Sequence, residues 1–150
     1  MIDLREVDGS TVEQCAALKC TDAQRQFANS PIWTLLQAAY DAELKDKCKV
    51  YAIMDDEAVV GMVRLDFAVF PDYYELTNLL IHAEYQRKNF ATAAMQKIID
   101  IFAADGKHRT IRLHVAKDNT AAIHLYEKAE FQHCPAQDDE WFDTYEYHIE

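Results

Sequence analysis

Residues 85–91 combine two features that favour anion binding: the cations Arg87 and Lys88, and a position between an apolar run and a helical pattern. The first turn of a helix leaves backbone N–H groups without partners, and the helix dipole adds positive potential there. A pyrophosphate suits such a junction. The alternative is an ordinary loop with solvated charges. The spacing of a P-loop is absent, so the segment is not that motif.

A second candidate lies in residues 119–131. Asn119 opens a helical pattern, and Tyr126 falls on its apolar face with Ala122 and Leu125. A tyrosine hydroxyl can donate a proton to a leaving group, and an asparagine at a helix start can bind a polar ligand. A core tyrosine and a helix N-cap are the alternatives. The two residues alone leave both interpretations open.

Together the two segments resemble the GNAT superfamily of N-acetyltransferases, over about residues 76–131. The family's acetyl-CoA loop, Gln/Arg-x-x-Gly-x-Gly/Ala, is matched in type and spacing by Gln86 and Ala91. Its helix motif, Asn-x-x-Ala-x-x-Leu-Tyr-x-Lys-x-Gly-Phe, is matched by Asn119, Ala122, Leu125, Tyr126, Lys128 and Phe131. The resemblance implies an acetyl-CoA-dependent N-acetyltransferase that uses no metal. Residues 70–73 are weakly similar to members that acetylate polyamines.

Two positions depart from the family pattern. Asn89 stands where the family usually has glycine, and Glu130 stands where the helix-ending glycine usually lies. If residue 89 needs a positive φ, asparagine is the least costly replacement, because its short amide tolerates the left-handed region. At Glu130 we expect either a helix end without a left-handed cap or a strain of about 1 kcal/mol.

The resemblance implies direct attack of a free amine on the acetyl-CoA thioester, without a cysteine nucleophile. Tyr126 would protonate the departing thiolate, and Asn119 would bind the pantetheine arm. Backbone N–H groups on the central strand would face the pantetheine and the thioester oxygen, near Leu79, Leu80 and Ile81. The cofactor pyrophosphate would bind to the loop and first helical turn, at Gln86, Arg87, Lys88, Asn89, Phe90, Ala91 and Thr92.

A base must take the proton of an ammonium substrate, and the sequence does not single one out. Polyamine-acetylating members carry a carboxylate on the central strand, where this chain has Thr77. Glu75 lies two residues earlier, on the same face of a strand, and could act through water. Asp66 and Asp72 are the other candidates. The alternative role of each of the three acids is a solvated surface charge.

We expect the acceptor amine to bind where the loop before the central strand meets the C-terminal strands. Both regions combine carboxylates with aromatic rings, which suits a small cation. The first region holds Phe70, Asp72, Tyr73, Tyr74 and Glu75, and the second holds Asp138, Asp139, Glu140, Trp141, Phe142 and Tyr145. The alternative is solubilising charge beside half-buried strand aromatics.

The composition bounds the class of protein. With 150 residues, 50% of them hydrophobic, the chain suits one domain with a sizeable core. Its net charge of −11 argues against a broad basic face for nucleic acid. No apolar run reaches the roughly 18 residues of a membrane helix, and the acidic start differs from a signal peptide, so we expect a cytoplasmic protein with no membrane partner. The cysteines lack zinc-ligand spacing, so we expect them to be reduced thiols. We also allow for a homodimer.

The elements that position these residues follow from hydrophobic periodicity. Three- and four-residue spacing predicts two helices within 11–40, one at 90–104 and one at 119–129. Alternating and buried apolar runs predict strands at 2–7, 49–54, 58–67, 76–81, 110–115, 131–134 and 141–149. This order mixes antiparallel pairs with β-α units, which predicts an α/β (α+β) fold with a mixed central sheet flanked by helices. The family resemblance adds that the central strands splay apart.

Three functions remain open at this point. The first is acetyl-CoA-dependent N-acetylation of a primary amine, such as a small polyamine. The second is acetylation of a protein N-terminus or lysine by the same chemistry. The third, suggested by Asn89 and Glu130, is a non-catalytic regulatory module that binds acetyl-CoA.

Overall fold

A computed structural model describes residues 1–27, 29–86 and 88–150 of the chain. The strands are β1 (Ile2–Glu6), β2 (Cys48–Asp55), β3 (Ala58–Asp66), β4 (Tyr74–Ile81), β5 (Thr110–Ala116), β6 (Gln132–His133) and β7 (Phe142–His148). The helices are α1 (Val12–Ala16), α2 (Asp22–Arg25), α3 (Pro31–Tyr40), α4 (Phe90–Asp105) and α5 (Thr120–Lys128), with 3-10 turns η1 (Ala83–Tyr85) and η2 (Pro135–Gln137). The predicted strands and the two C-terminal helices are confirmed, with ends that differ by at most two residues.

The expectation of two helices within residues 11–40 is wrong, because this part of the chain forms α1, α2 and α3. Tertiary contacts interrupt the helical pattern after α1. The Lys19 N–H donates to His82 Nδ1 at 2.9 Å, and the Lys19 carbonyl accepts from the Ala83 N–H at 2.6 Å. These bonds to the chain just after β4 replace the hydrogen bonds that a continuing helix would make.

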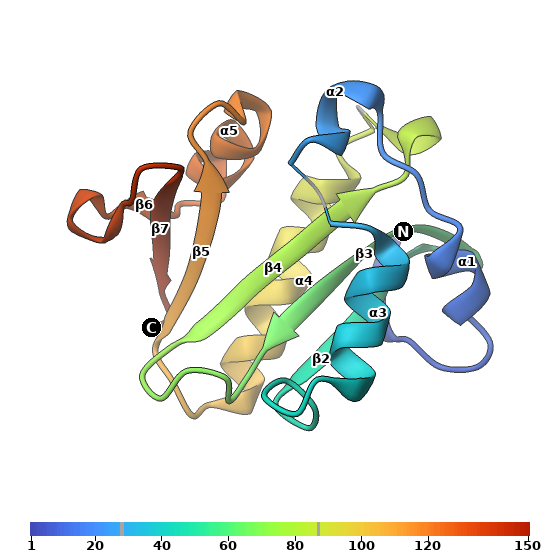
Figure 1. The fold of residues 1–150 in the computed structure, drawn as a ribbon, viewed down its shortest axis with the longest axis horizontal. Helices are drawn as coiled ribbons and strands as arrows, with labels where there is room; N and C mark the ends of the chain where they lie inside the picture. Colours follow the sequence, from blue (N-terminus) through green and yellow to red (C-terminus); the bar gives the residue numbers. More distant parts are fainter. Residues whose placement is uncertain (28, 87) are drawn as a thin grey trace.

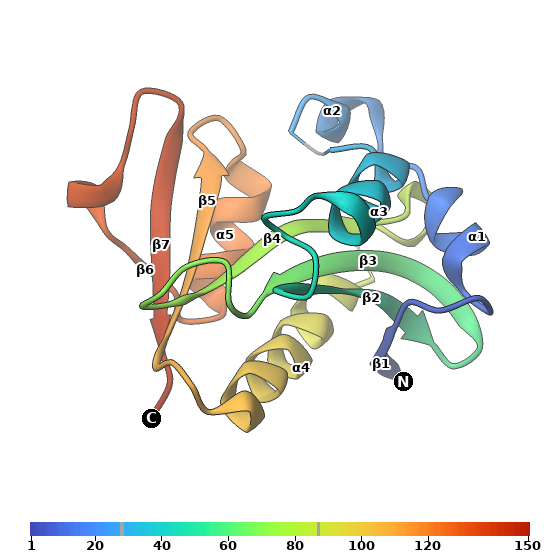
Figure 2. The same ribbon diagram turned by 60° about the horizontal axis from the view of Figure 1, so that its bottom comes forward.

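The strands form one mixed sheet in the order β1-β2-β3-β4-β5-β7-β6, in which β4 and β5 are parallel and all other neighbours antiparallel. Helices α1 to α3 cover one face of the sheet, and α4 lies on the other (Figures 1 and 2). Residues of α4 and α5 share a core cluster with β3, β4 and β5. The predicted mixed sheet flanked by helices is therefore confirmed. In the parts of the chain that the structure describes, no helix is long and apolar enough to span a membrane.

A bulge in β4 reverses which face of the sheet its side chains cover. Leu76 packs in the core under α4 with Phe102, whereas Leu80 packs on the opposite face with Cys15 of α1. Residues four apart on a regular strand lie on the same face, so one extra residue must be inserted between these two. Asn78, with a φ of 55°, lies where the pairing of β4 with β3 shifts register. The bulge bends β4 at its centre.

Beyond its first residues, β4 separates from β5. Among the described residues, Tyr74 with Ile111 and Glu75 with Arg112 are the only pairs that join the two strands. Figure 1 shows the strands close at the lower left and diverging upward. The splayed central strands are confirmed, and the bulge explains them, because it turns β4 away from its neighbour. The separation exposes the inner edges of two strands in the middle of the sheet.

Candidate active site

The gap between β4 and β5 opens into a cleft of about 1030 Å³. Its walls come from β4, the end of β5 with the loop that follows, α5, and the start of β7 with the loop before it, together with Gln24, Gln26, Phe27 and Asn29. Eight of the residues predicted to act in catalysis or to bind the cofactor line it: Glu75, Leu79, Leu80, Ile81, Gln86, Ala91, Asn119 and Tyr126. The fold therefore brings the two motif segments to one opening.

β4 presents backbone groups to this cleft. The His82 N–H donates to the Val60 carbonyl of β3 at 2.7 Å. Because residues of an antiparallel strand alternate between paired and open positions, the N–H and carbonyl of Ile81 face away from β3, into the gap. The Ile81 carbonyl accepts a hydrogen bond from the Gln86 side-chain amide. The Ile81 N–H faces the same gap, so it can donate to a molecule that binds there.

α4 begins at the edge of the same cleft. Asn89, which precedes it, has a φ of 61° and makes no side-chain capping hydrogen bond. Asn89 therefore adopts the left-handed conformation that an asparagine was expected to tolerate at this position. Among the described residues, no side chain caps the first N–H groups of α4, which lie at the positive end of the helix dipole and can bind an anion.

Other residues predicted to bind the pyrophosphate have different surroundings. Lys88, Phe90 and Thr92 are not among the described residues that line the cleft. The Lys88 Nζ lies 5.7 Å from the centre of the Tyr85 ring, and the Phe90 ring lies 6.2 Å from the same ring. Thr92 is exposed in the first turn of α4. Arg87 lies outside the described residues.

Asn119 is the N-cap of α5, and Tyr126 lies in its last turn. The Asn119 side-chain oxygen accepts a hydrogen bond from the Ala122 N–H at 3.3 Å, so its N-cap role is confirmed. Tyr126 is only 8% exposed and belongs to the core cluster, with its ring 6.0 Å from that of Phe131. It nevertheless lines the cleft, and burial raises the pKa of its hydroxyl to about 12. The tyrosine therefore keeps its proton at neutral pH and remains a donor.

The C-terminus of α5 has the left-handed cap that the family glycine would form. Glu130 has a φ of 72°, and its N–H donates to the Glu127 carbonyl at 3.0 Å. The Phe131 N–H donates to the Tyr126 carbonyl at 3.0 Å, which completes a Schellman motif. Of the two expectations for this position, the strained left-handed residue is the correct one.

Glu75 belongs to a row of polar side chains across the sheet. Strand alternation places this row on the face opposite to α4, with the members Arg64, Asp66, Glu75, Arg112, His114, Thr144 and Glu146. Arg64 donates two hydrogen bonds to Asp66, at 2.9 and 3.1 Å, and Arg112 Nη2 lies 2.7 Å from Glu146. Each guanidinium thus has its own carboxylate, and burial, together with the Asp66 charge, raises the pKa of Glu75 to about 7. Such a carboxyl group can accept and release a proton at neutral pH.

Comparison with known proteins decides the class. The sequence matches the Acetyltransferase (GNAT) family over residues 13–131. The chain belongs to the GNAT acetyltransferase family. It is therefore an acyltransferase enzyme. None of the curated proteins matches the sequence.

Solved GNAT structures share the whole fold at low sequence identity. The GNAT domain of S. lividans PAT superposes with a TM-score of 0.75 at 15% identity, over 97% of this chain and 89% of its own. The ribosomal-protein-S18-alanine N-acetyltransferase from Escherichia coli gives 0.73 at 17% identity, over 99% and 94%. Spermidine N-acetyltransferase from Vibrio cholerae, solved in complex with CoA and spermine, gives 0.70 at 20% identity, over 99% and 94%.

In this GNAT acetyltransferase, only part of the two acidic and aromatic regions reaches the cleft. Glu140, Trp141 and Phe142 line it from the second region, and Trp141 is 69% exposed. Tyr145 of that region is instead buried in the core, with its ring stacked on His133. The cleft therefore has one acidic and aromatic rim, formed by Glu140 and Trp141 just before β7 and by Phe142 at its start.

The first region contributes Glu75 alone. Phe70 stacks on Tyr73 with ring centres 4.9 Å apart, and the Arg112 guanidinium lies 4.0 Å over the Tyr73 ring. Tyr74 is fully buried, and its hydroxyl donates to Asp105 at 2.6 Å. The aromatic rings of this loop therefore stack on other side chains or are buried, and they do not line the cleft. That the loop shapes the acceptor pocket stays a prediction.

Two further expectations about the site need correction or extension. Asp66 is not a surface acid, since it is 1% exposed and bound to Arg64. His114, which no motif singled out, lines the cleft beside Glu75. The sequence does contain a signal for it, because it alternates with the buried Leu113 and Val115 and must point to the opposite face.

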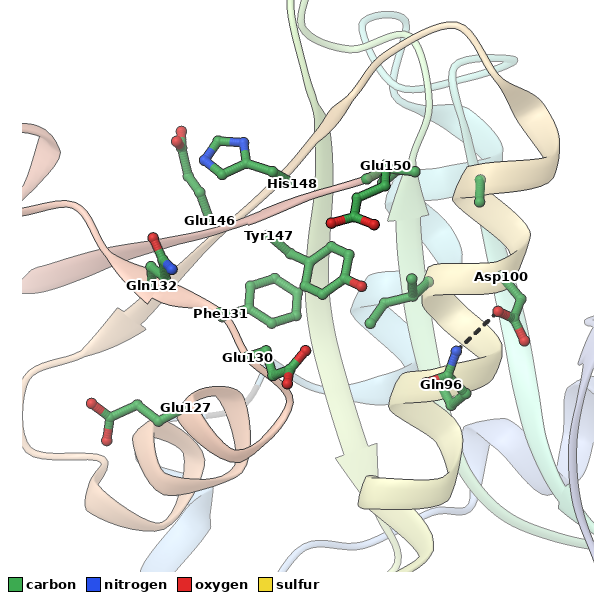
Figure 3. Close-up of a pocket in the computed structure, with 13 residues that line it drawn as sticks. Gln96, Asp100, Glu127, Glu130, Phe131, Gln132, Glu146, Tyr147, His148 and Glu150 are labelled. Atoms are coloured by element: carbon green, nitrogen blue, oxygen red, sulfur yellow. Dashed lines mark hydrogen bonds between the residues drawn. The ribbon is translucent and has the colours of Figure 1, made fainter.

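A second hollow of about 760 Å³ lies on the α4 side of the GNAT fold. Figure 3 shows the rings of Phe131 and Tyr147 facing α4, with several carboxylates around them, among them Glu130 and Glu150. Of the described residues that line it, none comes from β4 or from the start of α4. Of the quoted motif residues, Phe131 lines this hollow, whereas the larger cleft is lined by Gln86, Ala91, Asn119, Ala122, Leu125 and Tyr126.

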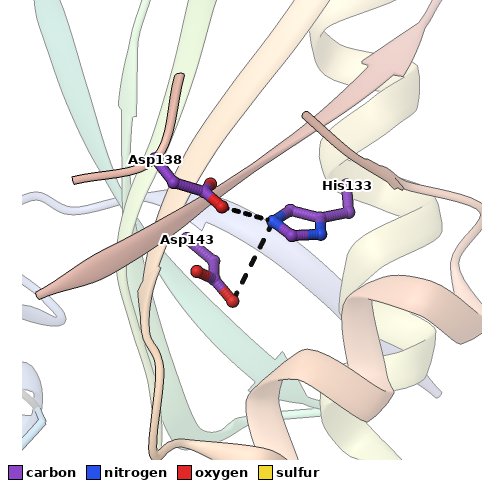
Figure 4. Close-up of side chains that lie close together, drawn as sticks. All are labelled: His133, Asp138 and Asp143. Atoms are coloured by element: carbon purple, nitrogen blue, oxygen red, sulfur yellow. Dashed lines mark hydrogen bonds and ion pairs between the residues drawn. The ribbon is translucent and has the colours of Figure 1, made fainter. Parts of the chain in front are cut away.

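One cluster of side chains could offer ligands to a metal ion. His133, Asp138 and Asp143 place one ligand atom each within 4.8 Å of the others (Figure 4). His133 Nε2 lies 2.7 Å from Asp138, and the Lys117 ammonium lies 2.7 Å from Asp143. These partners already compensate both carboxylates, so the cluster has a structural explanation. That the enzyme uses no metal stays a prediction.

Proposed function

We propose that this protein transfers the acetyl group of acetyl-CoA to a primary amine, by direct attack while both substrates are bound in the β4–β5 cleft. The observation that carries this proposal is the separation of β4 from β5 after two residue pairs, because the start of α4, the Asn78 bulge and Tyr126 all border the resulting cleft. Acetyl-CoA supplies an activated thioester, and the chain's residues hold and orient it.

The geometry fits the bound cofactor at three places. The uncapped first turn of α4 would hold the pyrophosphate, with Gln86 and Ala91 at the edge of the cleft. The backbone N–H of Ile81 would bind the pantetheine arm or the thioester oxygen. Leu79 and Leu80 line the same wall, and Asn119 faces them from the start of α5.

Tyr126 and Glu75 take the two proton-transfer roles in this proposal. The Tyr126 hydroxyl stays protonated at neutral pH and would donate to the departing sulfur. Glu75, with a pKa of about 7, would accept a proton from the ammonium group of the substrate. Each transfer of this kind contributes about 10²–10⁴-fold to the rate of such reactions.

The charges around the cleft favour a cationic acceptor, such as a small polyamine. Its lining carries the carboxylates of Glu75, Asp118 and Glu140, beside the exposed ring of Trp141. Lys117 also lines it, but its ammonium is bound to Asp143. An amine can therefore enter between acids and an aromatic face, which attract cations.

A panel of acceptors tests this function. Release of CoA thiol is measured with acetyl-CoA and spermidine, spermine, diamines, a lysine peptide and a peptide with a free N-terminal alanine. We expect the highest kcat/KM with a polyamine or diamine. Preference for either peptide would instead support a protein acetyltransferase. Thermal stabilisation by acetyl-CoA without thiol release from any acceptor would support the regulatory module.

The two departures from the glycine pattern give that last alternative little support. Asn89 and Glu130 both adopt the positive φ that a glycine would adopt. The turn before α4 and the cap of α5 therefore keep the backbone shape that the proposed enzyme needs.

A further inference from the structure

His114 faces Glu75 across the parallel pair of strands. Its Nε2 lies 3.5 Å from Glu75 Oε1, and both side chains line the cleft. The two residues are fixed on the same face of the sheet, because Glu75 pairs with Arg112, two residues before His114 on β5. The distance is slightly longer than a good hydrogen bond, and such contacts often tighten when substrate binds.

The tautomer of His114 follows from its other neighbour. Thr144 on β7 is fully buried, and its hydroxyl donates to the Gln137 carbonyl at 3.1 Å. A hydroxyl has one hydrogen, so toward His114 Nδ1, at 3.0 Å, the Thr144 oxygen can only accept. Nδ1 of His114 therefore carries a hydrogen, and in the neutral ring Nε2 has the free lone pair. That lone pair is on the nitrogen nearest to Glu75.

We propose that Glu75 and His114 act as a two-residue base that holds a single proton between Glu75 Oε1 and His114 Nε2, with Thr144 fixing the imidazole tautomer. This inference rests on the proposed function and deepens it. Glu75 is the member that contacts the amine. His114 acts through Glu75, and Thr144 acts through His114, so both are positioning residues.

The charges around the pair are compatible with one shared proton. Asp66 is paired with Arg64 of β3, and Arg112 of β5 is paired with Glu146 of β7. Within the described parts of the chain, the charge of Asp139, in the loop before β7, also acts on His114 and raises its pKa. Burial raises the pKa of Glu75 to about 7, and burial, together with the Arg112 charge, lowers the pKa of His114. The two shifts run in opposite directions, and the shift at Glu75 brings its pKa into the range in which an imidazole titrates, so a proton can be held by both groups.

The proton balance of the transfer is then complete. One proton of the substrate ammonium passes to Glu75 and is shared with His114. The freed nitrogen lone pair forms the bond to the acetyl carbon, and the carbon–sulfur bond breaks. Tyr126 gives its proton to the sulfur and regains the second proton that the nitrogen loses. The pair then releases its proton to water, so the net products are the acetylated amine, CoA thiol and one proton.

Imidazole NMR of the protein of residues 1–150 tests the pair without any acceptor. Long-range 1H–15N spectra report which ring nitrogen carries hydrogen, and a pH titration reports proton uptake. We expect the Nδ1–H tautomer at His114, and a downward shift of its titration by more than one pH unit in Glu75→Gln, because the carboxylate that stabilises the protonated ring is removed. Thr144→Val should mix the two tautomers. The exposed His124 on α5 is the internal control and should not change.

Two NMR results would overturn the pair: an Nε2–H tautomer in the wild type, or a His114 titration that Glu75→Gln leaves unchanged.

A kinetic experiment uses the best acceptor of the panel. His114→Gln should lower kcat/KM by about tenfold or more at neutral pH, move the pH profile, and leave the affinity for acetyl-CoA unchanged. His124→Gln is the matched control with unchanged activity. If no acceptor releases thiol, the proposed function fails, and the NMR result still decides whether the pair exists.

Discussion

Replacing Gly61 by alanine should disturb the cleft through the backbone of β4. Gly61 of β3 pairs with Ile81. A Cβ at this position would lie 2.3 Å from the Leu80 carbonyl oxygen and 3.0 Å from the Ile81 side chain. Contacts of a Cβ below 3.0 Å are essentially never seen, so the two strands must move apart by at least 0.7 Å. The nearest atom belongs to the backbone and cannot turn aside.

The expected cost follows from this overlap. Inserting a methyl group into a closely packed site costs about 1–3 kcal/mol of unfolding free energy. For a chain of this length we therefore expect the melting temperature to fall by roughly 2–12 °C. Leu80 and Ile81 both line the cleft, so their displacement should also weaken acetyl-CoA binding. A loss of about 1.4 kcal/mol there would be a tenfold increase in Kd.

Urea unfolding and calorimetric titration with acetyl-CoA measure the two effects. Gly9→Ala is the matched control, because a Cβ at Gly9 meets no atom within 4 Å. We expect this control to change stability by no more than about 0.5 kcal/mol and affinity not at all. If Gly61→Ala gave the same stability and affinity as Gly9→Ala, the argument from close strand approach would be refuted.

The other predictions concern the chemistry and the helix ends. Tyr126→Phe keeps the buried ring and should lower kcat by about 10²-fold or more while acetyl-CoA affinity and folding hardly change, and a kcat within about twofold of wild type would reduce Tyr126 to a packing residue. Burial raises the pKa of Glu75 from 4.5 to about 7, so the stabilising effect of its protonated form is complete below pH 4.5 and is lost as the pH rises through about 7. Glu75→Gln should therefore gain stability relative to wild type across this window, by at most about 3 kcal/mol. If the urea midpoints of the two proteins differed by the same amount at low and at high pH, the prediction would be contradicted. Glu130→Gly should stabilise the protein by about 1 kcal/mol in thermal melts, because the left-handed cap suits glycine, and no gain would mean that Glu130 is not strained. Lys88→Glu should weaken acetyl-CoA binding in calorimetry while the exposed Lys45→Glu, with the same change in net charge, does not, and equal affinities would remove Lys88 from the pyrophosphate site.

The sequence by itself determined most of the elements and the family. Periodicity depends on neighbours a few residues apart, so strands such as β2 and β3 and helices such as α4 could be predicted nearly to their ends. Motif spacing also depends only on nearby residues, and it singled out Gln86, Asn119 and Tyr126, which line the cleft. The tolerance of Asn89 for a positive φ also follows from its residue type alone.

The tertiary structure alone decided how these parts meet. The bulge at Asn78 depends on the packing of Leu76 and Leu80 against helices on opposite faces, and no local pattern in the strand specifies it. The burial of Asp66 depends on a partner that is itself buried, so its residue type suggested a surface acid. His114 meets Glu75 from a strand more than thirty residues away in sequence, because only the short parallel pairing of β4 with β5 brings the two side chains to one face. Contacts between distant segments depend on register, and register is set by the packing of the whole sheet.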